Sequence, residues 1–165
     1  MAHEITSGLA GLLMAAIGAS IVGAPERDPR TAYGPDTHIQ IVADEIAWES
    51  GPRSLPDGAE YAVLEGDPSG PGMFVMRLKL PDGFVIPPHT HPGVERVTVI
   101  SGTFHLGHGG RFDRERLERL PAGSFTVMPP GMRHFAVAEG ETVVQITTIG
   151  PWEIDYINPA DDPRR

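Results

Sequence analysis

Glycine and proline are spread along the whole chain, and the segments that they separate are short. This restricts the folds that the chain can adopt. The 165 residues include 20 Gly and 17 Pro, whereas an average chain has about 12% of the two together. The segments between these turn residues are short and of strand type, without a long helical period. The pattern predicts an all-β sandwich or barrel.

Nine runs of strand type follow the N-terminal part of the chain. They cover residues 39–42, 61–65, 73–80, 95–101, 103–107, 124–128, 134–138, 142–148 and 152–157. One charged segment differs from them, because residues 111–120 place Leu117 and Leu120 three positions apart. This spacing fits one or two helical turns, or a solvated excursion between two strands.

The composition excludes several classes of function. Cysteine is absent, so the sequence offers no disulfide, no thiolate metal site and no cysteine nucleophile. The 13 basic and 22 acidic residues give a net charge of −9, which disfavours binding to nucleic acid. With 40% hydrophobic and 21% charged residues, the sequence has the composition of a folded domain.

The first 24 residues form a separate apolar segment, within which residues 8–24 carry no charge. This stretch is shorter than the ~20 residues of a membrane-spanning helix, so no stable membrane span is expected. It is either an export signal or an N-terminal helix. An export signal would make the mature protein periplasmic or secreted, and otherwise the protein would be cytoplasmic. The helix would pack through four apolar residues: Leu9, Leu12, Leu13 and Ile17.

The rest of the chain divides into three parts. Residues 25–38 are polar and broken by proline, which is typical of a linker. Residues 39–158 hold the strand-type runs and are expected to form the β-barrel. Residues 159–165 read as a polar tail.

Two histidines and a glutamate lie close together in one stretch of the predicted barrel. His89 and His91 are two positions apart, so in an extended segment both imidazoles point to the same face. Glu95 opens the next apolar run and can point back to the same place across the turn at Pro92 and Gly93. Imidazole suits Zn, Cu, Fe and Ni, and a carboxylate adds a harder, charged ligand.

A second stretch, residues 123–134, combines a strand with a Pro-Pro-Gly turn and ends on His134. The turn would deliver a third imidazole to the start of the next strand. Three imidazoles and one carboxylate leave about two of six octahedral positions open for water, O₂ or a substrate. Two further histidines, His105 and His108, are interpreted as ordinary polar residues of a strand.

Together the two stretches resemble the two cupin motifs. The first motif, G-x5-H-x-H-x3,4-E-x6-G, is matched by Gly83, His89, His91, Glu95 and Gly102. The second motif, G-x5-P-x-G-x2-H-x3-N, is matched by Gly123, Pro129, Gly131 and His134, with Ala138 in place of the final asparagine. The resemblance covers residues 60–150 and is to small bacterial single-domain cupins.

The resemblance to the cupin superfamily implies an all-β jelly-roll barrel with a metal near its centre. It implies that one divalent ion, Fe, Mn, Ni, Cu or Zn, is bound by His89, His91, Glu95 and His134. Glu95 would be the catalytic residue, adding negative charge and shuttling a proton. The alternative is a metal-free barrel that only retains this arrangement. Cupins commonly pair across their barrels, so a homodimer is expected.

The expected function is that of a metal-dependent enzyme acting on a small organic molecule. Resemblance to cupin oxygenases favours dioxygenase-type oxidation of a small acid or phenol, and lyase, decarboxylase or isomerase chemistry is the other catalytic option. The alternative is a non-catalytic metal or small-ligand module, as in zinc-binding sensor and anti-sigma cupins. Such modules are normally joined to a helical regulator-binding domain, which the sequence has no segment long enough to form, and the enzyme is favoured on this ground.

Alternation along the strands predicts which residues surround the ligands. Val97 and Val99 would point inward with Glu95, and Ala136 would point inward with His134. These small and apolar side chains would keep water away from the centre.

For other residues near the site, the sequence allows two positions. Gln145 and Thr147 form a polar face that either lines the pocket or faces solvent. Four apolar residues are expected as pocket walls or as core: Met76, Val85, Phe125 and Met128. The motif glycines are expected in turns with positive φ or in close packing.

Overall fold

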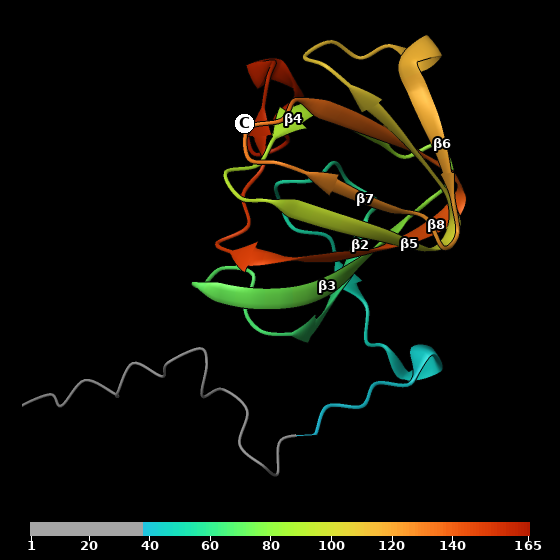
Figure 1. Cartoon of the computed structure of the whole chain (residues 1–165), viewed down its shortest axis with the longest axis vertical. Coiled ribbons are helices and arrows are strands. Elements are labelled where there is room, and N and C mark those ends of the chain that lie inside the picture. Colours follow the sequence, from blue (N-terminus) through green and yellow to red (C-terminus); the bar gives the residue numbers. More distant parts are fainter. Residues whose placement is uncertain (1–37) are drawn as a thin grey trace, which may run out of the picture. The chain divides into compact units, whose positions relative to one another are not determined.

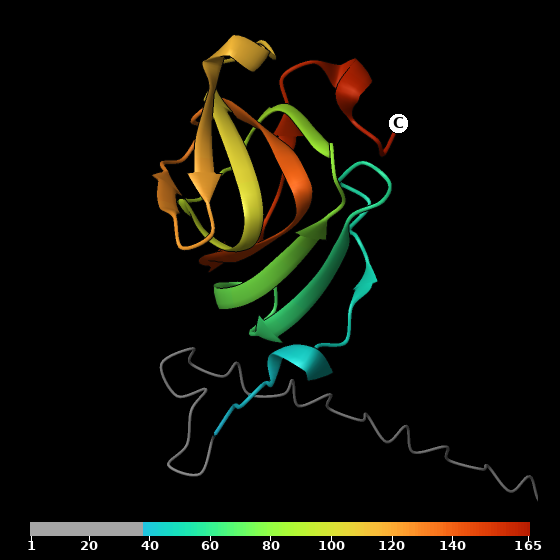
Figure 2. The same ribbon diagram turned by 90° about the vertical axis from the view of Figure 1, so that its right-hand side faces the viewer.

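Figures 1 and 2 show the computed structural model of the chain, which describes residues 38–165. The described part holds nine strands, and every strand pair in it is antiparallel. The strands are β1 (Glu49–Ser50), β2 (Glu60–Glu65), β3 (Gly72–Leu80), β4 (Val85–Thr90), β5 (Glu95–His108), β6 (Leu117–Pro121), β7 (Phe125–Met128), β8 (His134–Gly150) and β9 (Asp155–Tyr156). Three short 3-10 helices accompany them: η2 (Ala43–Glu45), η3 (Arg114–Arg116) and η4 (Pro159–Asp161).

The strands form two curved layers that share the long strands β5 and β8 (Figure 2). The first layer has the order β1-β2-β3-β8-β5-β7 and uses the C-terminal half of β8 with the N-terminal half of β5. The second layer has the order β9-β4-β8-β5-β6 and uses the other half of each long strand. This is a jelly-roll barrel, so the predicted all-β jelly-roll fold is confirmed.

Both long strands bend where they pass from one layer to the other. The register of the β5–β8 pair shifts between Val99 and Thr103. Gly102 lies in this bend with a φ of 72°, and a Cβ on it would overlap the Glu141 carbonyl oxygen, so only glycine fits. The buried Thr142 closes the bend, because its hydroxyl accepts a hydrogen bond from the Thr103 N–H at 3.2 Å and donates one to the Thr103 carbonyl at 3.1 Å.

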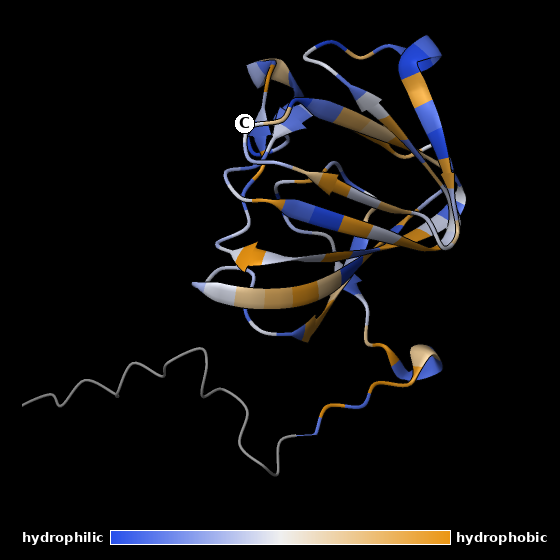
Figure 3. Cartoon of the chain, in the orientation of Figure 1, coloured by the Kyte–Doolittle hydropathy of each residue, from blue (hydrophilic) through white to orange (hydrophobic). Residues whose placement is uncertain are grey.

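Apolar side chains alternate along the strands and fill the space between the layers. Figure 3 shows this alternation of hydropathy along β5. On β3, four apolar residues are buried and those between them are more exposed, as expected for a sheet with one face against the core. The four are Phe74, Met76, Leu78 and Leu80. Facing strands continue the core through Val97, Val99, Leu106, Val144 and Ile146.

Two predictions about strand extent are wrong. Residues 39–42 form no strand, and three of their side chains, Ile39, Ile41 and Val42, are exposed. Although apolar residues dominate this run, no neighbouring strand pairs with it. Elsewhere, four predicted runs merge into only two strands, β5 and β8, because Gly102 and Gly140 occupy bends and do not end a strand.

Three further segments differ from their predicted form. Strand β4 is missing from the predicted runs because Pro87 and Pro88 interrupt its pattern, and its register shifts between Ile86 and His89, at these prolines. Residues 111–120 hold the 3-10 helix η3 and most of strand β6. Within 152–157, only the two residues of β9 pair as a strand.

The apolar segment 1–24 and all but the last residue of the linker 25–38 lie outside the described residues, and the interpretations of both stay predictions. Among residues 38–165, no helix has the length and hydropathy needed to cross a lipid bilayer.

Candidate metal centre

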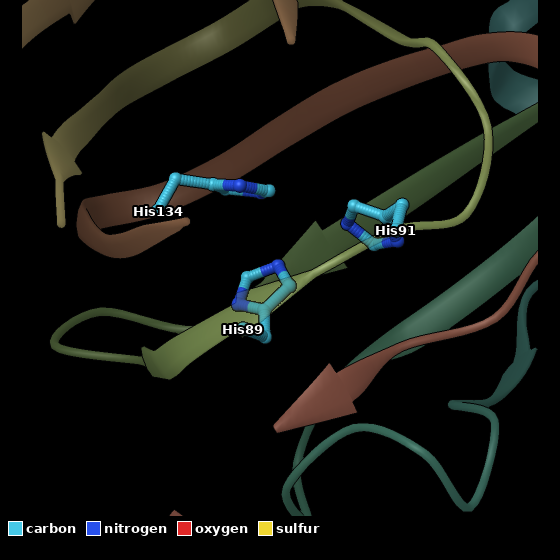
Figure 4. A group of neighbouring side chains, drawn as sticks. All are labelled: His89, His91 and His134. Carbon is cyan, nitrogen blue, oxygen red and sulfur yellow. The ribbon is translucent and has the colours of Figure 1, made fainter. Parts of the chain in front are cut away.

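Four residues from three strands and one connecting loop meet inside the barrel. His89 lies near the end of β4, His91 directly follows that strand, Glu95 opens β5 and His134 opens β8. All four are buried, with 3–5% of each residue exposed. Figure 4 shows the three imidazoles pointing toward one another. The structure therefore brings together the residues that the cupin resemblance singles out.

The distances between these side chains are those of a small cluster. One ring nitrogen from each of His89, His91 and His134 lies within 4.8 Å of the others, an arrangement that could hold a metal ion. Glu95 Oε2 lies 3.2 Å from His91 Nε2 and 3.6 Å from His134 Nε2. Since all four donor atoms face one small volume, a single ion could contact them together.

Each imidazole is oriented by a backbone carbonyl. The Nδ1–H groups donate to Pro87 O from His89 at 2.7 Å, to Glu153 O from His91 at 2.6 Å, and to Met132 O from His134 at 2.9 Å. A carbonyl oxygen only accepts hydrogen bonds, so Nδ1 carries the proton in all three rings. In the neutral ring, Nε2 then keeps its lone pair, which is the form that binds a metal.

Trp152 contacts the carboxylate oxygen of Glu95 that does not face the histidines. Its indole Nε1–H donates to Glu95 Oε1 at 3.3 Å, and its ring stacks on His91 with the centroids 5.6 Å apart and the planes inclined by 19°. Trp152 belongs to neither cupin motif, so the sequence does not predict it as part of the site. The chemical reason for its position is that a half-buried indole N–H needs an acceptor.

Burial and neighbouring charges set the protonation of the site. Burial, with the adjacent His134 and His91 imidazoles, lowers the pKa of His89 to about 3. Burial alone would raise the pKa of Glu95, but the neighbouring His134 and His91 outweigh it and hold that pKa well below its usual range. Burial would likewise lower the pKa of His91, yet the adjacent Glu95 carboxylate raises it. At neutral pH the site thus has a carboxylate anion beside a neutral His89.

The donor set fits a divalent metal ion. His91 Nε2 is buried and has no hydrogen-bond partner among the described residues, and leaving such an atom without any partner is unfavourable. Its contact with Glu95 lacks hydrogen-bond geometry. Three imidazole nitrogens and one carboxylate match the ligand preferences of Fe, Mn, Ni, Cu and Zn. A metal at this place would give the unpaired nitrogen a partner.

The expected neighbours of the site divide into two groups. Val97, Val99 and Ala136 belong to the buried core, as predicted. Of the four expected apolar walls, Met76 and Met128 are buried and Val85 is half-buried. The prediction for Phe125 is wrong, because its side chain is 60% exposed and points away from the core.

The polar face of β8 lies outside the barrel. Gln145 and Thr147 are half-buried and alternate with Val144 and Ile146, whose side chains belong to the core. Gln145 accepts a hydrogen bond from the Arg77 Nε–H at 3.2 Å on this outer face. Of the two options left open by the sequence, the solvent side is therefore the correct one.

Comparison with curated proteins finds relatives in plants and bacteria. Auxin-binding protein ABP19b of Prunus persica is 39% identical over 75 residues, which are 45% of this chain and 36% of that protein. The anti-sigma-E factor ChrR of Cereibacter sphaeroides is 28% identical over 118 residues, which are 70% of this chain and 48% of that protein. The chain thus spans between about a third and a half of the length of these two relatives.

Solved structures with the same architecture have low sequence identity. The polyketide cyclase RemF of Streptomyces resistomycificus superposes with a TM-score of 0.64 at 16% identity, covering 78% of this chain and 91% of that one. An acetylacetone dioxygenase of Acinetobacter johnsonii gives a TM-score of 0.57 at 17% identity, covering 79% and 83%. At this identity the likeness concerns the fold alone. The sequence profile of the ChrR cupin-like domain family matches residues 36–153, and the chain belongs to this family.

Proposed function

We propose that the protein binds one divalent metal ion through His89, His91, Glu95 and His134, and that it is a metal-dependent enzyme acting on a small organic molecule. The observation that carries this proposal is the convergence of three carbonyl-anchored imidazoles and one carboxylate inside an otherwise apolar barrel. Buried polar groups of this kind are unfavourable for folding unless they have a partner.

The residues around the centre would each have a defined part in such an enzyme. A bound ion would act as a Lewis acid or, if redox-active, exchange electrons. The three backbone carbonyls keep the Nε2 atoms directed at the centre. Glu95 supplies a negative charge to the centre, while Val97 and Val99 exclude water from the adjoining interior.

The reaction that we favour is dioxygenase-type oxidation of a small organic acid or phenol. Four protein ligands leave about two octahedral positions for O₂ or two substrate oxygens. The competing catalytic option is Lewis-acid chemistry, as in a lyase, decarboxylase or isomerase, which needs the same open positions but no redox metal.

A second candidate function is a non-catalytic module that binds a metal or a small ligand. It is supported by membership of the ChrR cupin-like domain family and by the 28% identity to an anti-sigma factor over 118 residues. In such a module the same four residues would hold zinc, and binding of a metal or ligand would alter contacts with a partner protein.

Oxygen consumption separates the two candidates. Iron-loaded wild-type protein is mixed with a panel of small acids, diketones and phenols in an oxygen electrode. The enzyme proposal predicts substrate-dependent oxygen uptake that His134→Ala abolishes, because this variant lacks one metal-binding imidazole. His105→Ala is the matched control, since His105 lies outside the centre, and should keep the activity. No uptake with any redox metal, together with tight zinc binding, would favour the non-catalytic module.

A further inference from the structure

The four residues between β8 and β9 contact two of the candidate ligands. Residues 151–154, which we call the connector, belong to neither strand, so no ladder of strand hydrogen bonds fixes their backbone. The Glu153 carbonyl accepts the Nδ1–H of His91 at 2.6 Å, and the Trp152 indole donates to Glu95 Oε1 at 3.3 Å. The position of the connector therefore sets how His91 and Glu95 are oriented.

Within residues 38–165, two hydrogen bonds hold the connector from outside the metal centre. The backbone N–H of Trp152 donates to the Pro68 carbonyl at 2.7 Å. At the other end, Arg164 Nη2 donates to the Ile154 carbonyl at 2.9 Å. Only 1% of Ile154 is exposed, and a buried carbonyl is unfavourable without a partner. Arg164 is thus a side chain that fixes the C-terminal end of the connector.

The end of the chain turns back so that Arg164 reaches the connector. Asn158 and Pro159 begin the 3-10 helix η4, and the Asn158 side chain accepts a backbone N–H of that helix at 3.2 Å, as residues at a helix start commonly do. Asp162 then accepts the Nε–H of Arg164 at 2.7 Å and an Nη2–H at 3.0 Å. Two hydrogen bonds between a guanidinium and one carboxylate fix the direction of both groups, so Asp162 holds Arg164 toward the connector.

The neighbouring arginine lacks this arrangement. Arg165 Nε lies 3.9 Å from Asp162 Oδ2, and the Arg165 side chain is more exposed than that of Arg164. In the part of the chain that the structure describes, only Arg164 of this pair donates a hydrogen bond to the connector. Arg165 therefore provides a control that has the same charge and the same place in the sequence.

We propose that Arg164 is a positioning residue of the candidate metal centre, which acts through the connector to hold the Glu153 carbonyl against His91. The inference deepens the proposed function and rests on it, because His91 is one of the proposed ligands. Without the hydrogen bond from Arg164, the connector moves away from the barrel more often. The hydrogen bond from His91 Nδ1–H to the Glu153 carbonyl then opens more often as well.

Exchange of the ring N–H protons with water, followed by NMR in metal-free protein, tests this role. The measurement is made above the pKa of His91, where its ring is neutral. Arg164→Leu should raise the exchange rate of the His91 Nδ1 proton about fivefold, the effect of losing one ordinary hydrogen bond. The His134 Nδ1 proton should exchange as in wild type, because its acceptor, the Met132 carbonyl, lies outside the connector.

Affinity for zinc, measured by competition with a chelator, connects the local effect to the metal centre. Arg164→Leu should weaken zinc binding by a similar factor, because the His91 ring is less firmly oriented. Arg165→Leu, the matched control, should equal wild type in both measurements. Arg164→Lys keeps a charged donor for the Ile154 carbonyl and should restore part of each effect.

Several results would overturn the role of Arg164. These are unchanged His91 exchange or zinc affinity in Arg164→Leu, equal acceleration at His91 and His134, an equal effect of Arg165→Leu, and an Arg164→Lys variant that behaves like Arg164→Leu. Equal acceleration at both histidines would indicate a general loss of stability. Wild-type protein that binds no zinc would contradict the proposed function, whereas zinc-binding protein in which Arg164→Leu leaves His91 unchanged overturns only the present inference.

Discussion

At the scale of single residues, the candidate centre depends on groups that never touch the ligand position. Backbone carbonyls of Pro87, Met132 and Glu153 fix the proton of each imidazole on Nδ1. Two of these carbonyls belong to residues two positions before the histidine they orient, so the local backbone and the site form together. Such outer contacts usually change metal affinity by 10–100-fold when they are lost.

Trp152 offers the most direct test of the groups that orient the candidate ligands. Trp152→Phe should retain an aromatic ring against His91 but remove the N–H that donates to Glu95. We expect the metal affinity to fall by about tenfold, with the fold intact, as measured by competition with a chelator. Trp48→Phe is the matched control, because Trp48 contacts Lys79 on the first layer. Equal affinities for Trp152→Phe and wild type would remove Trp152 from the account.

The sequence identifies residues by motif and misses those that act through tertiary contacts. His89, His91, Glu95 and His134 are recognisable because their spacing matches the two cupin motifs. Trp152 follows Glu95 by more than fifty residues in the chain, and no local pattern links the two. His105 and His108 look alike in sequence, and only the strand pairing shows that one faces out and the other in.

At the scale of strands, an apolar run in the sequence forms a strand only where a neighbouring strand is available to pair with it. The run at 39–42 is as apolar as many true strands, but it finds no neighbour and stays exposed. Strand β4 shows the reverse case. Pro87 and Pro88 interrupt its strand pattern in the sequence, yet its ends pair with β8 and β9. The predicted lengths of β5 and β8 are also wrong. Their glycines were expected to end a strand, but they lie at bends within one.

Close packing between β5 and β8 gives a test of the second layer. Gly107 lies against the fully buried Phe135, and a Cβ on Gly107 would overlap that ring. Gly107→Ala should therefore lower the free energy of unfolding by about 1–3 kcal/mol, as overpacking does, in urea denaturation of metal-free protein. Gly93→Ala is the control, because the nearest atom to its added Cβ would be 3.5 Å away. A Gly107→Ala variant as stable as this control would contradict the packing described.

At the scale of the whole molecule, the two-layered barrel explains how polar ligands can be held in a domain without cysteine. The two layers enclose an apolar core, and the buried histidine and glutamate side chains gather where β4, β5 and β8 begin or end. The all-β class follows from short strands and turn residues, and the jelly roll follows from the cupin resemblance. The placement of residues from three strands at one point requires the full topology. The expected homodimer stays a prediction.

The metal content of the purified chain shows directly whether His89, His91, Glu95 and His134 bind an ion. Wild-type protein, His105→Ala and the double variant His91→Ala/His134→Ala are each reconstituted with divalent metals, desalted and measured by elemental analysis. Because the double variant removes two of the four proposed ligands, we predict one divalent ion per chain in wild type and in His105→Ala, and little in the double variant. Wild-type protein that retains no metal after reconstitution would contradict the account.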